Sequence, residues 1–82
     1  MNVLRAYILM NTEASELWSV AQATLRIEGV KTADAVTGQF DAIAMVDFPK
    51  MDDLGRMIEK IQRLKGVIRT QSLIAIPPPV RE

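Results

Sequence analysis

The sequence predicts an α+β fold in which two helices cover one face of a four-stranded sheet. The apolar periodicity changes along the chain in the order strand, helix, strand, strand, helix, strand. The tripeptides Glu28-Gly29-Val30 and Lys65-Gly66-Val67 follow the two helical stretches in the same way, as a faint internal repeat. Two right-handed βαβ units that share one sheet give a ferredoxin-like βαββαβ sandwich, with the first and third strands in its centre.

A change of period separates the first strand from the first helix. Val3 to Met10 is a short apolar run that suits a strand, and Asn11 and Thr12 are typical of a turn or a helix cap. Glu13 to Ile27 has helical spacing, and we expect Trp18 to anchor this helix in the core. The expected apolar stripe of the helix consists of Ala14, Leu17, Trp18, Ala21 and Leu25.

The middle of the chain predicts a β-hairpin. Val30 to Thr37 is rich in β-branched residues, and Phe40 to Phe48 alternates in a way that suits a second strand. Gly38-Gln39 between them predicts a tight two-residue connection. Pro49 ends the second strand of this hairpin.

The second helix has the clearest apolar stripe, and Asp52 is its expected N-cap. The stripe consists of Leu54, Met57, Ile58, Ile61 and Leu64. On the other side of the helix, Asp52 with Arg56 and Glu59 with Arg63 are favourable pairs four residues apart.

Val67 to Ile76 predicts the last strand, because Pro77-Pro78-Pro79 cannot continue the hydrogen-bond ladder of a sheet. The sequence shows no linker and no low-complexity tract. We therefore expect residues 1–82 to form a single domain.

Composition excludes several classes of function. The chain has 82 residues, ten Lys plus Arg, ten Asp plus Glu, and neither Cys nor His. Without Cys and His there is no disulfide, no usual zinc site and no Ser-His-Asp or Cys-His catalytic arrangement, so we expect no metal and no cofactor. Zero net charge argues against direct contact with nucleic acid. No apolar run approaches the length of a membrane span, and we expect a cytoplasmic protein.

The central strands are apolar on both faces, but two helices can cover only one. On the uncovered side the first strand carries Tyr7 and Leu9, and the third strand carries Ile43 and Met45. Four strands of about six residues give a plate of roughly 400 Å², which is large for a monomer to expose. We therefore expect this face to stack on the same face of a second copy.

One segment has the features of a ligand site. Gly38 in the expected turn allows a ligand to approach free backbone N–H groups, which can hold an anion. Asp41 can receive an ammonium group, and the hydroxyl of Thr37 can assist. An α-amino acid presents this pair of opposite charges. The same residues, with Gln39, also fit an ordinary hairpin turn that requires a positive φ.

The sequence resembles a known family at several points in the same order. The run Val36-Thr37-Gly38-Gln39-Phe40-Asp41 is followed by an alternating strand, an Asp-led helix ending in Leu64-Lys65-Gly66-Val67, and Arg69-Thr70-Gln71-Ser72. Together these motifs resemble the effector-binding domain of the Lrp/AsnC transcription regulators, also called the RAM domain. The resemblance extends from about Val3 to Ile76.

The resemblance implies a dimeric α/β barrel made from two stacked sheets, with dimers assembled into rings such as octamers. It implies an amino-acid effector bound between dimers, and its site positions match Thr37, Gly38, Gln39, Asp41, Thr70 and Ser72. Ordinary members carry an N-terminal helix-turn-helix domain that this sequence lacks. We therefore expect a stand-alone effector-binding module that forms mixed assemblies with a full-length regulator rather than binding DNA itself.

Two alternatives remain open at this point. Small monooxygenase-type enzymes also form stacked ferredoxin-like dimers, with Tyr7 as a candidate acid in this chain, although such sites often use the His that is absent here. Other βαββαβ amino-acid-binding modules associate edge to edge or through their helices. Face-to-face sheets would favour the Lrp/AsnC-type interpretation over these modules.

Overall fold

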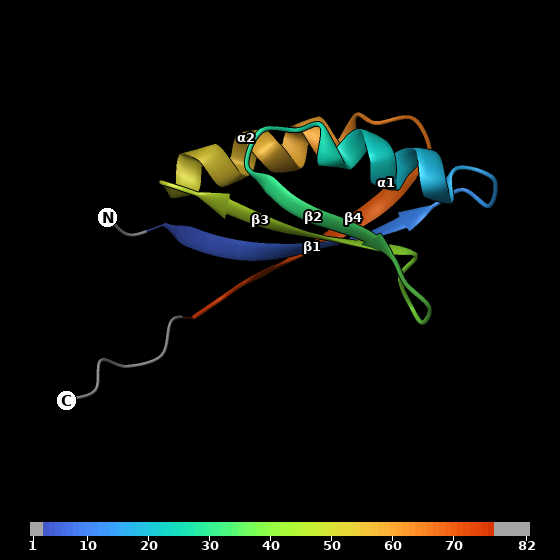
Figure 1. The fold of residues 1–82 in the computed structure, drawn as a ribbon, viewed down its shortest axis with the longest axis horizontal. Coiled ribbons are helices and arrows are strands. Elements are labelled where there is room, and N and C mark those ends of the chain that lie inside the picture. Colours follow the sequence, from blue (N-terminus) through green and yellow to red (C-terminus); the bar gives the residue numbers. More distant parts are fainter. Residues whose placement is uncertain (1–2, 77–82) are drawn as a thin grey trace.

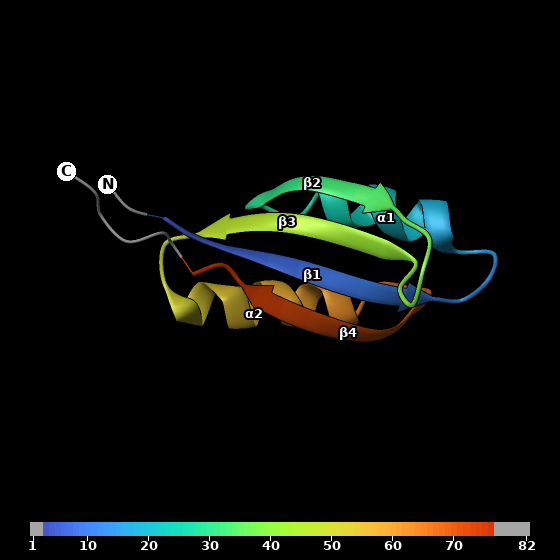
Figure 2. The same ribbon diagram turned by 90° about the horizontal axis from the view of Figure 1, so that it is seen from below.

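The computed structural model describes residues 3–76. The observed elements are β1 (Leu4–Thr12), α1 (Leu17–Leu25), β2 (Val30–Ala35), β3 (Ala42–Phe48), α2 (Met51–Gln62) and β4 (Val67–Ile74). They form one antiparallel sheet in the order β2-β3-β1-β4, with both helices on the same face (Figure 1). The predicted ferredoxin-like sandwich is confirmed, with β1 and β3 in the centre and β2 and β4 at the edges (Figure 2).

The core lies between the helices and the sheet. The alternate residues of β1 and β3 that point to the helices are buried, and Ile61 and Leu54 of α2 pack on them. The opposite residues of the central strands are only half-buried, because no element of the described chain covers them. Across this open face Tyr7 lies opposite Met45, and Leu9 lies opposite Ile43, as the alternation predicts.

The first strand is longer than predicted and the first helix is shorter. Asn11 and Thr12 belong to β1 rather than to a turn, because both are paired with β4. The chain then turns through a hydrogen bond from the Glu16 N–H to the Glu13 carbonyl (2.9 Å) before α1 begins at Leu17.

Trp18 is not a core residue, contrary to the prediction. Its side chain is 70% exposed, and Leu25 of the same expected stripe is 49% exposed. The buried residues of α1 are Val20, Ala21 and Thr24, so Ala21 of the expected stripe is buried as predicted, and Leu17 packs partly buried against the core. Because this helix is apolar around much of its circumference, more than one stripe has helical spacing, and contact with the sheet selects one of them.

The start of α2 also differs from the prediction. Lys50 occupies the N-cap position and makes no side-chain capping hydrogen bond within the described residues. Asp52 lies within the first turn, where its negative charge interacts favourably with the helix dipole. Arg56 pairs with Asp53 (3.1 Å) rather than with Asp52. The predicted pair of Glu59 with Arg63 is confirmed at 2.8 Å.

The strand ends near the hairpin and the C-terminus are shorter than predicted. β2 ends at Ala35 and β3 begins at Ala42, so the connection is a longer loop than the two residues Gly38-Gln39. β4 ends at Ile74, and the Ala75 N–H still donates to the Arg5 carbonyl (2.8 Å). Pro77-Pro78-Pro79 lies outside the described residues.

Candidate functional site

The loop between β2 and β3 is fixed to the end of β1 by backbone hydrogen bonds. The Val36 N–H donates to the Asp41 carbonyl (2.9 Å), and the Asp41 N–H donates to the Met10 carbonyl (2.9 Å). The Asp41 carboxylate accepts a further bond through Oδ2 from the Thr12 N–H (2.8 Å). Asp41 is therefore partly a structural residue, with only one of its two oxygens used among the described residues.

Thr37, Gly38 and Gln39 form the exposed tip of this loop. Gly38 has φ +129°, and nothing lies within 4 Å of the place that a Cβ atom would occupy. The position therefore requires glycine for its backbone conformation rather than for space. Exposure of the tip leaves the predicted approach of a ligand to this backbone as a prediction.

Asn11 of β1 and Arg69 of β4 contact the loop or each other, although neither is among the site residues that the sequence predicts. Asn11 Nδ2 donates to the Gln39 carbonyl (2.8 Å), and Arg69 Nε donates to Asn11 Oδ1 (3.1 Å). The Arg69 guanidinium also lies 6.0 Å from the centre of the Phe40 ring. In the sequence, the Arg69-Thr70-Gln71-Ser72 motif was the one signal that pointed toward Arg69. No local pattern could have indicated Asn11, because it meets Arg69 only through the register of β1 against β4.

Arg69 of β4 places a positive charge close to the β2–β3 loop. Within residues 3–76 it has no carboxylate partner, and only its Nε is used in a hydrogen bond. A guanidinium with free N–H groups is well suited to bind a carboxylate in a two-pronged arrangement. Within residues 3–76, the loop and the adjoining part of β4 therefore offer a cation with free N–H groups at Arg69 and a carboxylate oxygen of Asp41 that accepts no hydrogen bond.

Thr70 and Ser72 lie on the helix-covered side of β4, apart from the loop. Thr70 Oγ1 accepts a hydrogen bond from Gln62 Nε2 of α2 (3.1 Å). Ser72 lies opposite Ile8, whose side chain is fully buried beneath the helices. β1 separates both residues from β3. One protomer alone therefore brings together Thr37, Gly38, Gln39 and Asp41, but not Thr70 and Ser72.

The open sheet face carries one strong ion pair. Arg5 Nε and Nη2 donate to the two carboxylate oxygens of Asp47 (2.7 and 3.0 Å). The hydrogen bonds and the charge of Arg5 lower the pKa of Asp47, and those of Asp47 raise the pKa of Arg5. The Arg5–Asp47 pair lies two residues along the strands from the half-buried pair Tyr7 and Met45. The apolar surface of the open face therefore has charged side chains beside it at this end.

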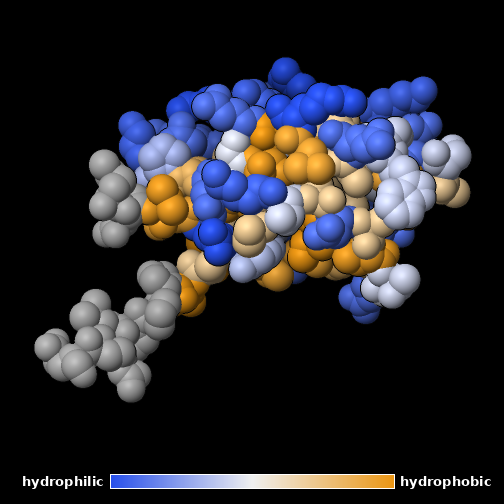
Figure 3. Space-filling view, viewed as in Figure 1, coloured by the Kyte–Doolittle hydropathy of each residue, from blue (hydrophilic) through white to orange (hydrophobic). Residues whose placement is uncertain are grey.

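The part of the chain that the structure describes shows neither a metal-ligating cluster nor a membrane-spanning helix. Within residues 3–76, no three acidic side chains converge in a way that could hold a metal ion. Over the same residues, neither helix has the length and apolar character of a membrane span. On the surface, polar residues gather along the outer side of the helices, and apolar residues gather toward the sheet (Figure 3).

The sandwich and its exposed β2–β3 loop define a small α+β domain whose sheet has one covered and one open face. A family model described as the Lrp/AsnC ligand-binding domain matches residues 5–82. The chain belongs to this family.

Similarities to individual proteins are consistent with membership of this family. The chain is 25% identical over 76 residues to the HTH-type transcriptional regulator LysM of Sulfurisphaera tokodaii, and the match covers 92% of this chain but 54% of LysM. The chain thus spans about half the length of that regulator. Among solved structures, hypothetical protein PHS023 from Pyrococcus horikoshii is 34% identical, with 92% of each chain covered and a TM-score of 0.83. TTHA0845 from Thermus thermophilus is 25% identical, with 95% and 99% covered and a TM-score of 0.88.

Proposed function

We propose that this chain is a sensing and oligomerisation domain that binds an amino acid and modulates transcription through a partner regulator, without contacting DNA itself. Family membership supports an effector-binding role and favours it over the monooxygenase-type enzyme. The balance of ten basic and ten acidic residues supports the absence of direct DNA contact.

Self-association through the open sheet face is the first part of this proposal. Tyr7, Leu9, Ile43 and Met45 are half-buried there, and Leu73 is 48% exposed. Covering this surface with the same surface of a second copy would remove it from water on both sides and give a dimeric α/β barrel. Further association of dimers into rings such as octamers, and mixed assembly with a full-length Lrp/AsnC-type regulator, would use the surfaces left outside the barrel.

Amino-acid binding at the β2–β3 loop is the second part. The Arg69 guanidinium would hold the ligand carboxylate together with backbone N–H groups near Gly38, and the free oxygen of Asp41 would receive its ammonium group. Thr37 and Gln39 would line the open side. Thr70 and Ser72 would join the same site only from a neighbouring copy, as polar contacts at its rim.

L-Methionine is the first probe to test. The regulator NMB0573 from Neisseria meningitidis was solved as a complex with L-Met. That protein is 20% identical to this chain, with 95% and 53% covered and a TM-score of 0.79, so the likeness supports the fold and suggests a ligand to try.

The observation that carries the ligand proposal is the pair of unused charges beside an open glycine loop. Isothermal titration calorimetry with each of the twenty amino acids tests it, on the wild-type chain, Asp41→Asn and Arg69→Gln. We expect at least one amino acid to bind, and each variant to weaken that binding about tenfold, because each removes one charge-assisted contact.

Arg26→Gln is the matched control, since Arg26 is exposed beyond the end of α1 and has no ion pair among residues 3–76. Its affinity should equal that of the wild type. Equal binding by all four proteins, or no binding of any amino acid at about 1 mM, would refute the loop site.

A further inference from the structure

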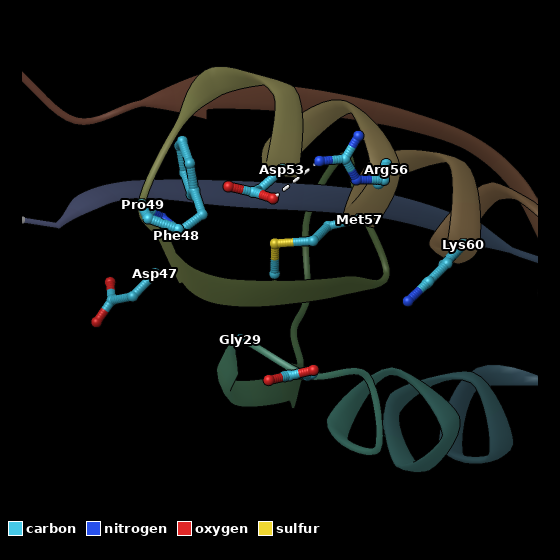
Figure 4. A pocket seen from close by; sticks show the side chains of 9 residues that line it. Gly29, Asp47, Phe48, Pro49, Asp53, Arg56, Met57 and Lys60 are labelled. Carbon is cyan, nitrogen blue, oxygen red and sulfur yellow. Dashed lines mark hydrogen bonds and ion pairs between the residues drawn. The ribbon is translucent and has the colours of Figure 1, made fainter.

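A cleft lies at the opposite end of the sheet from the β2–β3 loop. Its volume is about 380 Å³, and it is formed where β3 ends, where α2 begins and where the turn after α1 passes Gly29. This volume lies at the lower end of the range of small-molecule sites. Figure 4 shows Asp53, Arg56, Met57 and Lys60 on the α2 side and Gly29 on the facing side.

The floor of the cleft is apolar and tightly fixed. Phe48 is 2% exposed and Met57 is 7% exposed. Gly29 has φ +95°, and a Cβ atom there would lie 2.7 Å from the Met57 methyl carbon. The Asp47 N–H donates to the Gly29 carbonyl (2.9 Å), which holds this turn against the end of β3. A ligand with an apolar portion could therefore rest on a preformed surface.

The walls carry charges of both signs, and several are unused. Arg56 and Lys60 are four residues apart, so they lie on the same side of α2. Among the described residues, the one carboxylate oxygen that Arg56 pairs with is Oδ1 of Asp53 (3.1 Å), and Asp53 Oδ2 is buried without a hydrogen-bond partner there. Within residues 3–76, neither Lys60 nor Glu28 forms an ion pair.

We propose that this cleft binds a small zwitterion of the α-amino-acid type, at a site separate from the β2–β3 loop. The ligand carboxylate lies between Arg56 and Lys60, its ammonium group faces Glu28 and the Asp53 carboxylate, and its apolar part rests on Met57 and Phe48. A simple anion is a poorer occupant because acidic side chains line the same walls, and a simple cation would leave Lys60 without a partner.

The position of the cleft makes it independent of the other proposed surfaces. The charged side chains proposed to hold the ligand come from α2 and from the turn after α1, on the helix side of the sheet. Asp47 also lines the cleft, but its carboxylate is held by Arg5 on the open face, so stacking of that face on a second copy would leave the helix-side walls accessible. β3 runs from Ala42 beside the loop to Phe48 in the cleft, which places the two sites about 20 Å apart. Ligand binding at one site can therefore be removed by mutation while binding at the other remains.

Amide NMR titration of the full chain with each of the twenty amino acids tests the proposal, because chemical shifts locate each binding event. We expect saturable shifts at Gly29, Met57 and Lys60 with at least one amino acid. Lys60→Gln should weaken this binding about tenfold, whereas Lys65→Gln, an exposed lysine outside the cleft, should not. The N-acetylated and the decarboxylated forms of the same amino acid should both bind more weakly.

The outcomes separate this site from the loop site. Asp41→Asn should weaken the binding reported by the shifts around Gly38 about tenfold and leave the binding reported around Gly29 unchanged. The cleft proposal is overturned if no amino acid shifts the Gly29 and Met57 amides at about 10 mM, or if Lys60→Gln binds as tightly as the wild type. Neither result would bear on the shifts around Gly38.

Discussion

At the scale of single residues, the contact between Arg5 and Asp47 links the sheet register to the pH dependence of stability. The two residues lie directly opposite each other on β1 and β3, and their side chains are 45% and 14% exposed. Because Arg5 lowers the pKa of Asp47 in the folded state, the pair stabilises the fold fully above the unfolded pKa of about 3.9. This contribution is lost as the pH falls through the lower folded pKa.

The variant Asp47→Asn tests that linkage. It should unfold at a lower urea concentration than the wild type at pH 6, because it lacks the charged pair. The difference should shrink as the pH falls below about 4, where Asp47 of the unfolded chain becomes protonated, and it should vanish below the lower pKa that Asp47 has in the folded state. Urea unfolding at a fixed protein concentration from pH 2 to 7 measures it, and a difference that does not change with pH would contradict the assignment.

At the scale of the elements, two glycines of the second half have opposite structural roles. Gly66 has φ +96° after α2, and a Cβ atom there would lie 2.5 Å from Glu16 Cβ. Gly55 lies within α2 with nothing within 4 Å of its Cβ position. Only the first of them is required by the fold.

The two alanine variants should therefore change stability in opposite directions. Gly55→Ala should stabilise the protein by about 0.5–1 kcal/mol, because it lowers the entropy of the unfolded chain and favours the helix. Gly66→Ala should destabilise it by more than about 1 kcal/mol through backbone strain and the contact with Glu16. Thermal or urea unfolding of both variants measures this, and a stabilising Gly66→Ala would show that the turn can relax.

The helix α1 offers a second matched pair, since Trp18 is 70% exposed and Val20 is 1% exposed. Val20→Ala should cost about 1.5–3 kcal/mol of folding free energy, because it removes buried methyl groups from the core. Trp18→Ala should change stability by less than about 0.5 kcal/mol, as expected for an exposed position. A large loss with Trp18→Ala in a protein shown to be monomeric would contradict the observed burial.

At the scale of the whole molecule, the two helices cover one face of the sheet, and no described element covers the other face. Ile43 lies on the open face, where it is half-buried opposite Leu9. Ile43→Asp should convert the proposed dimer into a monomer, because it places a charge in the apolar interface. Sedimentation velocity at micromolar concentration measures this.

Trp18→Asp is the control for that experiment, since it also replaces an exposed apolar side chain with a charge but lies on the helix layer. It should retain the dimer. A wild-type chain that sediments as a monomer, or an Ile43→Asp variant that keeps the wild-type mass, would contradict association through the open face.

The sequence by itself determined the element order, the central and edge strands, and the two faces of the sheet. These features depend on local patterns, namely the period of apolar residues and the glycines that end each helix, which act within a few residues of the chain. The apolar residues on both sides of β1 and β3 were enough to predict the uncovered face.

Only the tertiary structure decided which groups meet. Asn11 reaches Arg69 and the Gln39 carbonyl because β1 pairs with β4 in one particular register, and Thr70 turns toward Gln62 for the same reason. Trp18 is exposed because the sheet selects another side of an apolar helix. The cleft beside Lys60 forms between segments that are distant in sequence. Such contacts depend on long-range packing, which a periodic pattern within one segment does not specify.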